Sequence, residues 1–291
     1  MANLGKVDYL FIVNQKVPKE NILEINRHFR GRNRQFICTK RWKEAVEKIA
    51  DLDAQKSFKT AIAVGGDGTV NAVVNGLMKH KNSRTFGVIP LGTGNDFAKS
   101  LNLPKSVEEN CRLILSAEPK EIDVGKINEF YFANIASIGI DALATKLSAN
   151  QSGVWKKIHP AVHYALGLLK AILRYKAADF KIIGTYLPSP REDSAKWGSR
   201  PEPEIELGFK KKVLLAAFAN GKIYGGNFPI APTAKIDDKN LTLCVIEAMP
   251  FWKTLRNLPK LLAAKHGELK EVLFADFKGI IIASDNGLVQ I

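Results

Sequence analysis

Two glycine-rich turns contain the residues of this sequence that are best suited to chemistry. The first spans Gly65 to Thr69, reads GGDGT and follows an apolar run. Glycines let the backbone approach an anion closely, and the N–H groups at the start of a helix bind phosphate oxygens. Asp67 would repel a bare phosphate, so its carboxylate indicates a bridging Mg²⁺ ion, or a hydroxyl or water that it orients.

The second turn spans Pro90 to Asp96, reads PLGTGND and follows the next apolar run along the chain. Ligands of open α/β sheets bind beyond the carboxyl ends of the strands, where neighbouring turns lie together. Two such turns, each with an aspartate, therefore predict one nucleotide cleft. Neither turn has the Gly-Lys-Ser/Thr of a Walker A motif, and neither contains the dinucleotide pattern GxGxxG.

A purely structural interpretation of both turns also fits the sequence. In that interpretation, Thr69 caps the helix after the first turn, and Asn95 and Asp96 cap a short helix over residues 97–101. The sequence alone leaves this alternative open.

The elements that must position the turns alternate between two hydrophobic periods from Val7 to Leu115, which is typical of strands and helices in a parallel α/β layer. The pattern predicts strands over residues 7–13, 35–39, 60–64 and 86–89. The helical spacing of apolar residues predicts helices near residues 22–29, 42–50, 70–78 and 107–115. Ser106 and Glu109 have the spacing of a capping box at the last of these helices.

Beyond Gly125 strand-like runs dominate, and we expect an antiparallel β sandwich or meander. The predicted strands cover residues 131–135, 180–186, 205–207, 213–219, 241–246 and 279–283. The fold class is thus α/β, with a parallel-sheet nucleotide-binding domain over residues 1–125 and a β-rich sandwich domain over residues 126–291. The sequence leaves open whether the C-terminal end returns to the first domain.

Composition limits the class of protein. Apolar residues make up 46% and charged residues 25% of the 291 residues, which excludes a disordered, collagen-like or coiled-coil chain. Cys38, Cys111 and Cys244 lie far apart, which argues against a disulfide framework and a zinc site. The N-terminal apolar run is too short for a signal peptide, and no run approaches a membrane span, so we expect a soluble, cytoplasmic protein.

Lysine and arginine number 43 against 29 acidic residues, a net charge of +14 that favours phosphates, anionic membranes or nucleic acid as partners. Residues 161–175 and 251–266 combine apolar side chains with lysines and arginines, a pattern typical of helices in a membrane interface. The alternative for both is a helix packed on the sheet with solvated lysines. Neither an RNA-binding aromatic motif nor a helix-turn-helix signature is present, so we expect no nucleic-acid partner.

At both turns the sequence resembles the diacylglycerol kinase catalytic family, which includes bacterial soluble lipid kinases and sphingosine kinases. GGDGT alone is shared with NAD kinases and phosphofructokinases, whereas its combination with LGTGNDF makes the resemblance specific. Further matches lie along nearly the whole chain, at Glu121–Gly125, Asn134–Ala142, Asn220–Gly221, Gly225–Gly226, Ala231–Pro232 and Ala234–Asp238.

The resemblance implies a two-domain kinase that uses ATP and Mg²⁺, with a first domain like those of NAD kinases and phosphofructokinases. By position, it implies catalytic roles for Asp67 and Asp96. It places Asp123 in an acidic metal-binding network and implies a structural Mg²⁺ held by Asp237, Asp238 and the backbone of Leu241. It implies that nine residues bind the nucleotide: Asn14, Gly65, Gly66, Gly68, Thr69, Gly92, Thr93, Gly94 and Asn95.

Three departures from the family pattern bear on these roles. The first strand ends in Asn14-Gln15-Lys16 where the family has Asn-Pro-x-x-Gly, so Lys16 would replace glycine N–H groups with a positive charge. Lys239-Asn240 stands where the metal loop usually has glycine. In the family the last strand runs into Asp-Gly-Glu, whose carboxylate is proposed to accept the proton of the lipid hydroxyl, and we expect this general base beyond Ile291.

We therefore expect a peripherally membrane-associated enzyme that transfers the γ-phosphate of ATP to a lipid hydroxyl. Conversion of diacylglycerol to phosphatidic acid is the first interpretation. One alternative is a kinase of a soluble acceptor such as NAD. Another is a catalytically silent nucleotide- or lipid-binding protein, which the absence of Asp-Gly-Glu from the printed sequence suggests. The sequence leaves the oligomeric state open, a homodimer included.

Overall fold

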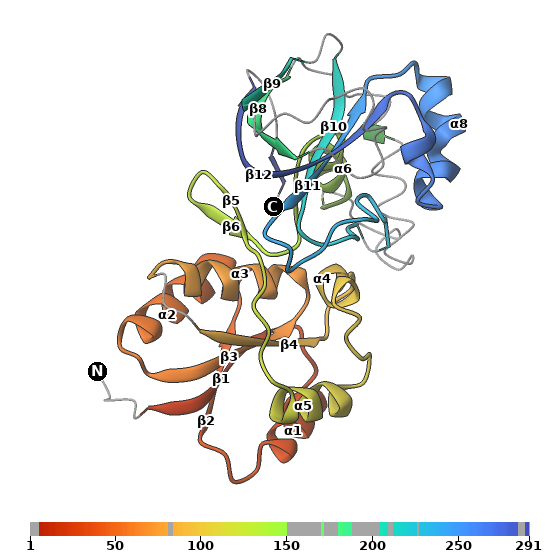
Figure 1. Ribbon diagram of the computed structural model, residues 1–291. Coiled ribbons are helices and arrows are strands. Elements are labelled where there is room, and N and C mark those ends of the chain that lie inside the picture. Colours follow the sequence, from red (N-terminus) through yellow and green to blue (C-terminus); the bar gives the residue numbers. More distant parts are fainter. Residues whose placement is uncertain are drawn as a thin grey trace. The chain divides into compact units, whose positions relative to one another are not determined.

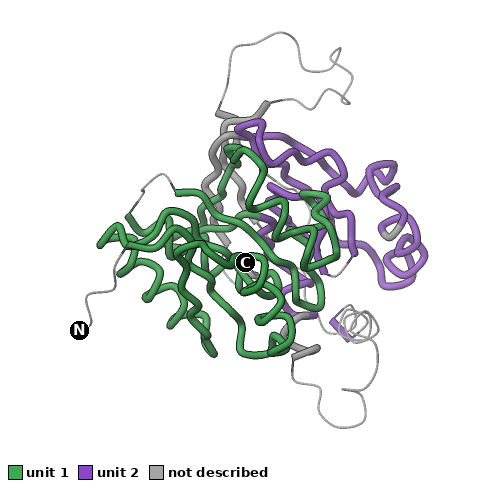
Figure 2. The backbone as a smooth tube through the Cα atoms, turned by 90° about the horizontal axis from the view of Figure 1, so that it is seen from below, with its two compact units in different colours: residues 1–133 green, residues 134–291 purple. Residues whose placement is uncertain are grey.

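The computed structural model describes residues 6–80, 84–149, 170–171, 180–187, 204–208, 212–225, 227–284 and 289–290. The chain divides into two compact units, Met1–Ala133 and Asn134–Ile291, which Figure 2 shows in different colours. Each unit has its own sheet and its own core. The predicted basic helix over residues 161–175 lies outside the described residues, apart from residues 170–171.

The first unit is built on a four-stranded parallel sheet (Figure 1). In sheet order its strands are β2 (Arg34–Thr39), β1 (Val7–Asn14), β3 (Phe58–Gly65) and β4 (Thr85–Pro90). The central strands are apolar along most of their length because helices cover both faces of such a sheet. The four strands predicted from the sequence are confirmed, and all four end at the same edge.

Helices lie on both faces of this sheet (Figure 1). On one face, Phe29 and Cys111 pack against Phe11 in a single core cluster. On the other face, the helix that contains Gly76 approaches the helix that contains Ile49 closely, because Gly76 has no side chain. A methyl group added at Gly76 would lie 2.7 Å from Ile49 Cβ. The first pair of helices is α1 (Lys19–His28) and α5 (Val107–Ser116), and the second is α2 (Trp42–Ala54) and α3 (Asp67–Met78).

The predicted cap of α5 is confirmed, since Ser106 Oγ accepts a hydrogen bond from the Glu109 N–H at 3.3 Å. The short helix α4 (Asp96–Ser100) follows β4. It begins one residue before the predicted start.

A two-stranded hairpin, β5 (Gly125–Ile127) and β6 (Phe130–Phe132), closes the first unit. It is held on α3 because Asn75 Nδ2 donates to the Tyr131 carbonyl at 2.8 Å and the Tyr131 N–H donates to Asn75 Oδ1 at 2.9 Å. Asn71 Nδ2 donates to the same carbonyl at 3.2 Å. The hairpin accounts for the difference between the domain boundary expected after Gly125 and the compact unit, which extends to Ala133.

The second unit contains an antiparallel sheet in the order β13-β7-β10-β11-β12-β8-β9. The expected antiparallel, β-rich second domain is therefore confirmed. The C-terminal strand β13 pairs with β7 within this unit. The strands are β7 (Ile135–Gly139), β8 (Phe180–Leu187), β9 (Glu204–Gly208), β10 (Val213–Ala219), β11 (Leu241–Glu247), β12 (Val272–Ser284) and β13 (Val289–Gln290).

Among the described residues of this unit, helices include α6 (Ile140–Ala149), α8 (Phe251–Leu262) and the short 3₁₀ helix η2 (His266–Glu268), and residues 170–171 are also helical. Its core joins Ile140 and Ala144 of α6 to Leu215 and Ala217 of β10, and Leu258 of α8 packs against this cluster. The core thus lies between one face of the sheet and the two helices.

Two predicted strands differ from the structure. The strand predicted over residues 131–135 is divided, because the backbone of Asn134 turns and its carbonyl accepts the N–H groups of Asn220 and Gly221 at 2.8 and 2.9 Å. The strand predicted from Gly279 begins at Val272 instead. Four prolines among polar residues between Leu187 and Glu204 predict a loop, and this segment lies almost wholly outside the described residues.

Candidate active site

Three strand ends of the first unit meet at one edge of the parallel sheet: Asn14 of β1, Gly65 of β3 and Pro90 of β4. A methyl group added at Gly65, whose φ is +155°, would lie 3.1 Å from Asn14 Cβ and 2.5 Å from Thr69 Oγ1. The Leu91 N–H donates to the Gly65 carbonyl at 2.9 Å. The two glycine-rich turns therefore lie side by side, with Asn14 next to the first.

The turns touch through Gly66 and Gly92. A methyl group added at Gly92 would lie 2.2 Å from Gly66 Cα, and one added at Gly66 would lie 3.0 Å from Gly92 Cα. A side chain at either position would therefore push the turns apart. This need for glycine is independent of any ligand.

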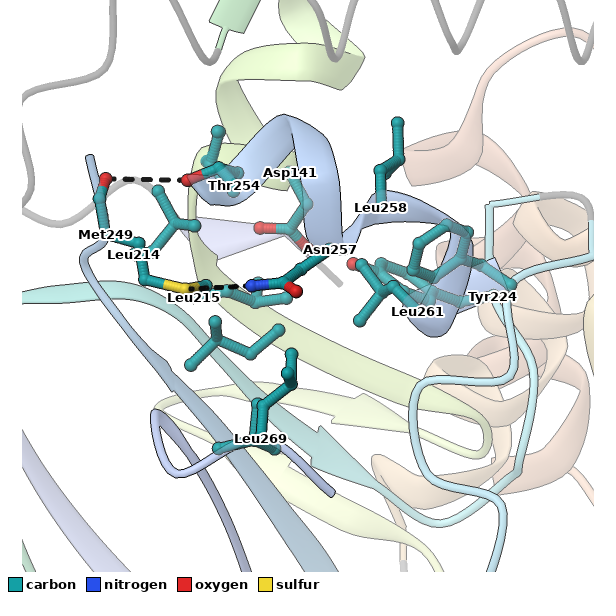
Figure 3. A pocket seen from close by; sticks show the side chains of 14 residues that line it. Asp141, Leu214, Leu215, Tyr224, Met249, Thr254, Asn257, Leu258, Leu261 and Leu269 are labelled. Atoms are coloured by element: carbon teal, nitrogen blue, oxygen red, sulfur yellow. Dashed lines mark hydrogen bonds between the residues drawn. The ribbon is translucent and has the colours of Figure 1, made fainter. Parts of the chain in front are cut away.

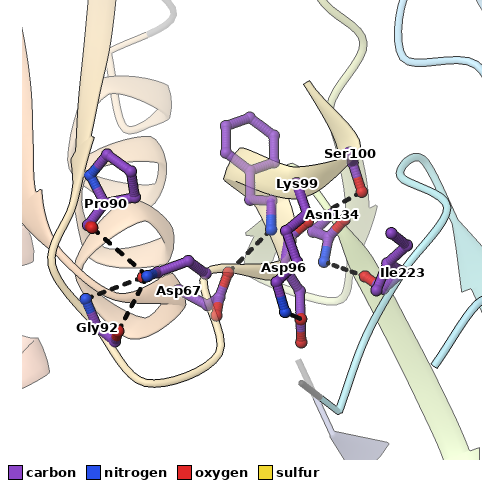
Figure 4. A network of polar contacts seen from close by, with 10 residues as sticks. Asp67, Pro90, Gly92, Asp96, Lys99, Ser100, Asn134 and Ile223 are labelled. Atoms are coloured by element: carbon purple, nitrogen blue, oxygen red, sulfur yellow. Dashed lines mark hydrogen bonds and ion pairs between the residues drawn. The ribbon is translucent and has the colours of Figure 1, made fainter. Parts of the chain in front are cut away.

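Asn95 fixes the shape of the second turn (Figure 4). Its Oδ1 accepts the Gly92 N–H at 2.9 Å, and its Nδ2 donates to the carbonyls of Gly92 and Pro90 at 2.9 and 3.4 Å. The backbone of Asn95 is left-handed, with a φ of 54°, a conformation that asparagine tolerates better than most residues. Asn95 would thus support a ligand by holding the turn in shape.

Asp67 links the first turn to α4, because its Oδ1 accepts the Phe97 N–H at 2.9 Å across 30 positions of sequence (Figure 4). In most helices, the side chain of the N-cap residue accepts such a hydrogen bond from an N–H of the first turn. The structural interpretation is confirmed only in part. Asn95 occupies the N-cap position of α4, but its side chain bonds to its own turn and makes no capping bond. Asp96 is already helical, and Gly66 is the N-cap residue of α3, so that Thr69 lies inside that helix.

The two aspartates flank Gly94. A methyl group added at Gly94 would lie 3.0 Å from Asp67 Oδ2 and 3.5 Å from Asp96 Oδ2. Asp96 is 6% exposed, and its Oδ1 lies 3.4 Å from Lys99 Nζ. Asp67 is partly exposed, and two carboxylates that lie close to one position repel each other less when a cation lies between them. The oxygen donors around Gly94 therefore fit Mg²⁺, which prefers carboxylate ligands and phosphate oxygens.

Part of the turn backbone is open to a ligand. Gly68, Gly92 and Thr93 are exposed. Apart from the adjacent residues and the backbone of α3 itself, no described atom lies within 4 Å of a methyl group added at Gly68. Gly68 lies in the first turn of α3, where N–H groups lack partners inside the helix and the helix dipole is positive. This surface is suited to phosphate oxygens.

The other predicted metal ligands lie in two different units. Asp123 precedes β5 in the first unit, whereas Asp237 and Asp238 are exposed in the loop before β11. Lys239 takes a left-handed φ of 62°, the conformation that a glycine would adopt without strain. Among the described residues, no three His, Cys, Asp or Glu side chains form a group that could hold a metal ion. The metal-binding roles of Asp123, Asp237, Asp238 and Leu241 stay predictions.

Comparison with known families covers both units. Residues 8–127 match the diacylglycerol kinase catalytic domain. Residues 134–291, more than half of the chain, match the YegS C-terminal NAD kinase beta sandwich-like domain. The chain belongs to the diacylglycerol kinase family. The resemblance inferred from the two turns is thereby confirmed.

Individual members of the family agree with this assignment. A diacylglycerol kinase of Staphylococcus epidermidis is 28% identical over 82% of this chain and 71% of its own length. A probable lipid kinase, YegS-like, of Chromohalobacter salexigens is 31% identical over 72% of this chain and 61% of its own length. The crystal structure of a diacylglycerol kinase from Bacillus anthracis strain Sterne has a TM-score of 0.66 at 24% identity, over 97% of this chain and 88% of that one, so the two share a fold.

The second unit of this family member contains an apolar cavity of about 50 Å³ (Figure 3). Most of its lining is aliphatic or aromatic. The polar residues among the lining are Asp141, Tyr224, Thr254 and Asn257. A few polar groups in an apolar wall are typical of sites for largely apolar molecules, but such sites usually enclose several hundred Å³, so this cavity accommodates only part of a larger molecule.

Asp141 is the charged residue of this cavity and is 1% exposed. Its carboxylate accepts hydrogen bonds from the Ser137 hydroxyl and, at 2.9 Å, from the Ala142 N–H. Burial raises the pKa of Asp141 above its ordinary value, although these hydrogen bonds and one with the Tyr224 side chain act in the opposite direction. Asp141 lies in the Asn134–Ala142 segment that resembles the family, but no role was predicted for it from the sequence.

Among the described residues, no helix is both long enough and apolar enough to span a bilayer.

Proposed function

We propose that this member of the diacylglycerol kinase family transfers the γ-phosphate of ATP to the hydroxyl of diacylglycerol, which forms phosphatidic acid. The observation that carries this proposal is the contact between the two glycine turns, with Asp67 and Asp96 on either side of Gly94. The printed names of the relatives, diacylglycerol kinase and probable lipid kinase, support a lipid as the acceptor.

Phosphoryl transfer depends on positioning and charge neutralisation more than on covalent chemistry. In the proposed site, the backbone N–H groups of the first turn bind phosphate oxygens, and Asp67 and Asp96 hold Mg²⁺. When bound, the ion neutralises charge on the phosphates. Because Asp67 also bonds to the Phe97 N–H, it fixes the start of α4 and with it Asp96. The phosphate-binding and metal-binding groups are thus positioned together.

The cavity of the second unit supports a lipid acceptor. Its apolar lining suits hydrocarbon, and Asp141 is a polar group in an otherwise largely apolar wall. An ester or hydroxyl group of the lipid would form hydrogen bonds with polar side chains of this lining, such as Thr254 and Asn257. We include binding of part of the lipid in this cavity, and action at a membrane surface, in the proposal.

The test replaces the charge of Asp67 and keeps its hydrogen-bonding shape. Asp67→Asn retains an oxygen that can accept the Phe97 N–H, so the melting temperature should change little. Transfer of labelled phosphate from ATP to diacylglycerol in detergent micelles should fall about 10²- to 10³-fold, a typical loss when one stabilising group of a reaction centre is removed. Asp96→Asn should have a similar effect.

Asp51→Asn, which removes an exposed carboxylate on α2, is the matched control and should leave the rate unchanged. A wild-type rate for Asp67→Asn would disprove the assignment of the reaction centre. Phosphorylation of NAD in the absence of lipid would assign a soluble acceptor in place of diacylglycerol.

A further inference from the structure

Helix α8 has two chemically different faces. Thr254, Asn257, Leu258 and Leu261 line the cavity described above. The opposite face is exposed and consists of residues at helical spacing: Trp252, Arg256, Pro259, Lys260 and, directly after the helix, Ala263. In Figure 1, α8 lies at the periphery of the second unit.

Trp252 dominates the outer face. It is 76% exposed, more than the other large hydrophobic residues that are exposed in the described part of the chain. Its ring makes an edge-to-face contact with Phe251 at a centroid distance of 5.0 Å. Phe251 and Leu255 are partly exposed at the side of the helix. A single exposed hydrophobic residue is common, whereas adjacent apolar side chains such as Phe251 and Trp252 form a patch of the kind that contacts a partner.

The charges around α8 are mostly positive. The helix and the segment after it contain five cations, Lys253, Arg256, Lys260, Lys265 and Lys270, and two acids, Glu268 and Glu271. Glu271 pairs with Lys253 at 2.6 Å and Glu268 with Lys260 at 3.4 Å. Arg256 and Lys265 form no ion pair with any residue that the structure describes.

The helix dipole explains the position of Lys260, which lies in the last turn of α8, but not that of Lys253. The first turn of α8 contains Lys253 and no acid, although the positive end of the helix dipole favours acids there. Tryptophan is enriched at membrane–water interfaces, and basic helices with a tryptophan lie in the plane of the interface. Anionic headgroups attract lysine and arginine at short range. Charge and aromatic content together therefore fit an anionic bilayer.

We propose that the outer face of α8 docks this protein on anionic membranes, with Trp252 in the interface and Arg256 and Lys260 at the headgroups. The inference rests on the proposed function, since it names the membrane-binding surface of a lipid kinase. In this proposal, the outer face of α8 contacts the bilayer and its inner face lines the proposed lipid cavity, so one helix joins the membrane to the cavity.

The test measures sedimentation of the full chain with vesicles. Vesicles of equimolar phosphatidylcholine and phosphatidylglycerol should bind the wild type, and vesicles of phosphatidylcholine alone should bind it much less. Trp252→Ala should weaken partitioning about tenfold, and Trp252→Phe should recover part of the loss. Arg256→Glu should weaken it at least about fivefold, since it removes one cation and adds an acid.

Matched controls come from the first unit. Leu23→Ala removes an apolar residue that is 61% exposed on α1, and Arg30→Glu reverses an exposed charge beyond that helix. Both should bind vesicles like the wild type. Wild-type partitioning of Trp252→Ala and Arg256→Glu, with unchanged melting temperatures, would overturn the proposal. Displacement from vesicles by an equal charge of RNA, with RNA binding lost in the same two variants, would also overturn it.

Two further readouts separate this proposal from the proposed function. With short-chain diacylglycerol in detergent micelles, Trp252→Ala and Arg256→Glu should retain the wild-type rate. Asp67→Asn should lose that rate but bind vesicles normally. If the wild type binds vesicles through α8 and phosphorylates no lipid, the kinase proposal fails and the docking surface stands.

Discussion

At the scale of single residues, Gly68 and Gly92 are glycines for different physical reasons. Gly92 touches the backbone of Gly66, and a methyl group there would lie 2.2 Å from Gly66 Cα. A methyl group at Gly68 would enter open space in the described part of the structure. A side chain at Gly68 would therefore interfere with ligand binding, whereas a side chain at Gly92 would destabilise the folded turns. Variants at these two positions distinguish an effect on ligand binding from an effect on folding.

Gly68→Ala should keep the free energy of unfolding or raise it by about 0.5–1 kcal/mol, because alanine is the better helix former. The same variant should bind ATP at least about tenfold more weakly, since the methyl group would come between phosphate oxygens and the N–H groups of the turn. Gly92→Ala should instead lose about 1–3 kcal/mol of unfolding free energy. Chemical denaturation and titration with a fluorescent ATP analogue measure both quantities. Wild-type ATP affinity in Gly68→Ala would show that phosphates do not approach this residue.

The sequence pointed to the two turns because their residue types are unusual, but it did not predict how their side chains are used. The bond from the Phe97 N–H to Asp67 depends on the tertiary position of α4, and the bonds from Asn95 to Gly92 depend on a left-handed backbone. Neither is encoded in local spacing. No role was predicted for Asp141 because the cavity that it lines is formed by residues far apart in the sequence, such as Tyr224 and Asn257.

At the scale of elements, the parallel strands of the first unit were predictable because both of their faces are buried, which makes each a short apolar run. Periodicity failed where one apolar run contains two elements, as between Phe130 and Ile140, because it does not locate a turn inside such a run. It failed also at the start of β12, where Asp276 interrupts the apolar pattern. Its carboxylate is accommodated in the sheet because it accepts the Thr242 hydroxyl at 2.7 Å.

The short helix η2 makes the stability of the second unit depend on pH. His266 is fully buried, its Nε2 lies 3.0 Å from the Ile230 carbonyl, and its ring packs on Phe274. Burial lowers the pKa of His266 below its ordinary value of 6.5. The unfolded chain then binds a proton more readily than the folded one. The contribution to stability is complete well above pH 6.5 and is lost as the pH falls from about 6.5 toward the folded pKa.

His266→Gln should remove this pH dependence, which amounts to at most about 1.4 kcal/mol per pH unit. Urea denaturation between pH 8 and pH 5 should give a smaller slope of unfolding free energy in the variant than in the wild type. The variant is also expected to be less stable at pH 8 because packing on Phe274 is lost, so the slopes are compared and not the absolute values. His80→Gln, at an exposed position, should retain the wild-type slope, and equal slopes in all three proteins would exclude this role of His266.

At the scale of the whole molecule, the contacts that shape the candidate active site are local to one compact unit. The bonds of Asp67, Asn95 and Leu91, and the close approach of Gly66 and Gly92, all join residues within Met1–Ala133. The same unit has its own core, in which Phe11 and Phe29 are fully buried. The chain outside this unit is not needed for any of these contacts.

Residues 1–133 alone should therefore unfold cooperatively on heating and bind ATP with Mg²⁺ within about tenfold of the full chain, because domains with their own core commonly fold independently. The fragment should transfer no phosphate to diacylglycerol, since the proposed lipid cavity lies in Asn134–Ile291. Circular dichroism and nucleotide titration measure folding and binding, and Gly68→Ala in the fragment should reduce ATP affinity as in the full chain. A fragment that folds but does not bind ATP would show that the turns need residues of the second unit. A fragment without a cooperative transition would show that the first unit depends on the second for its stability.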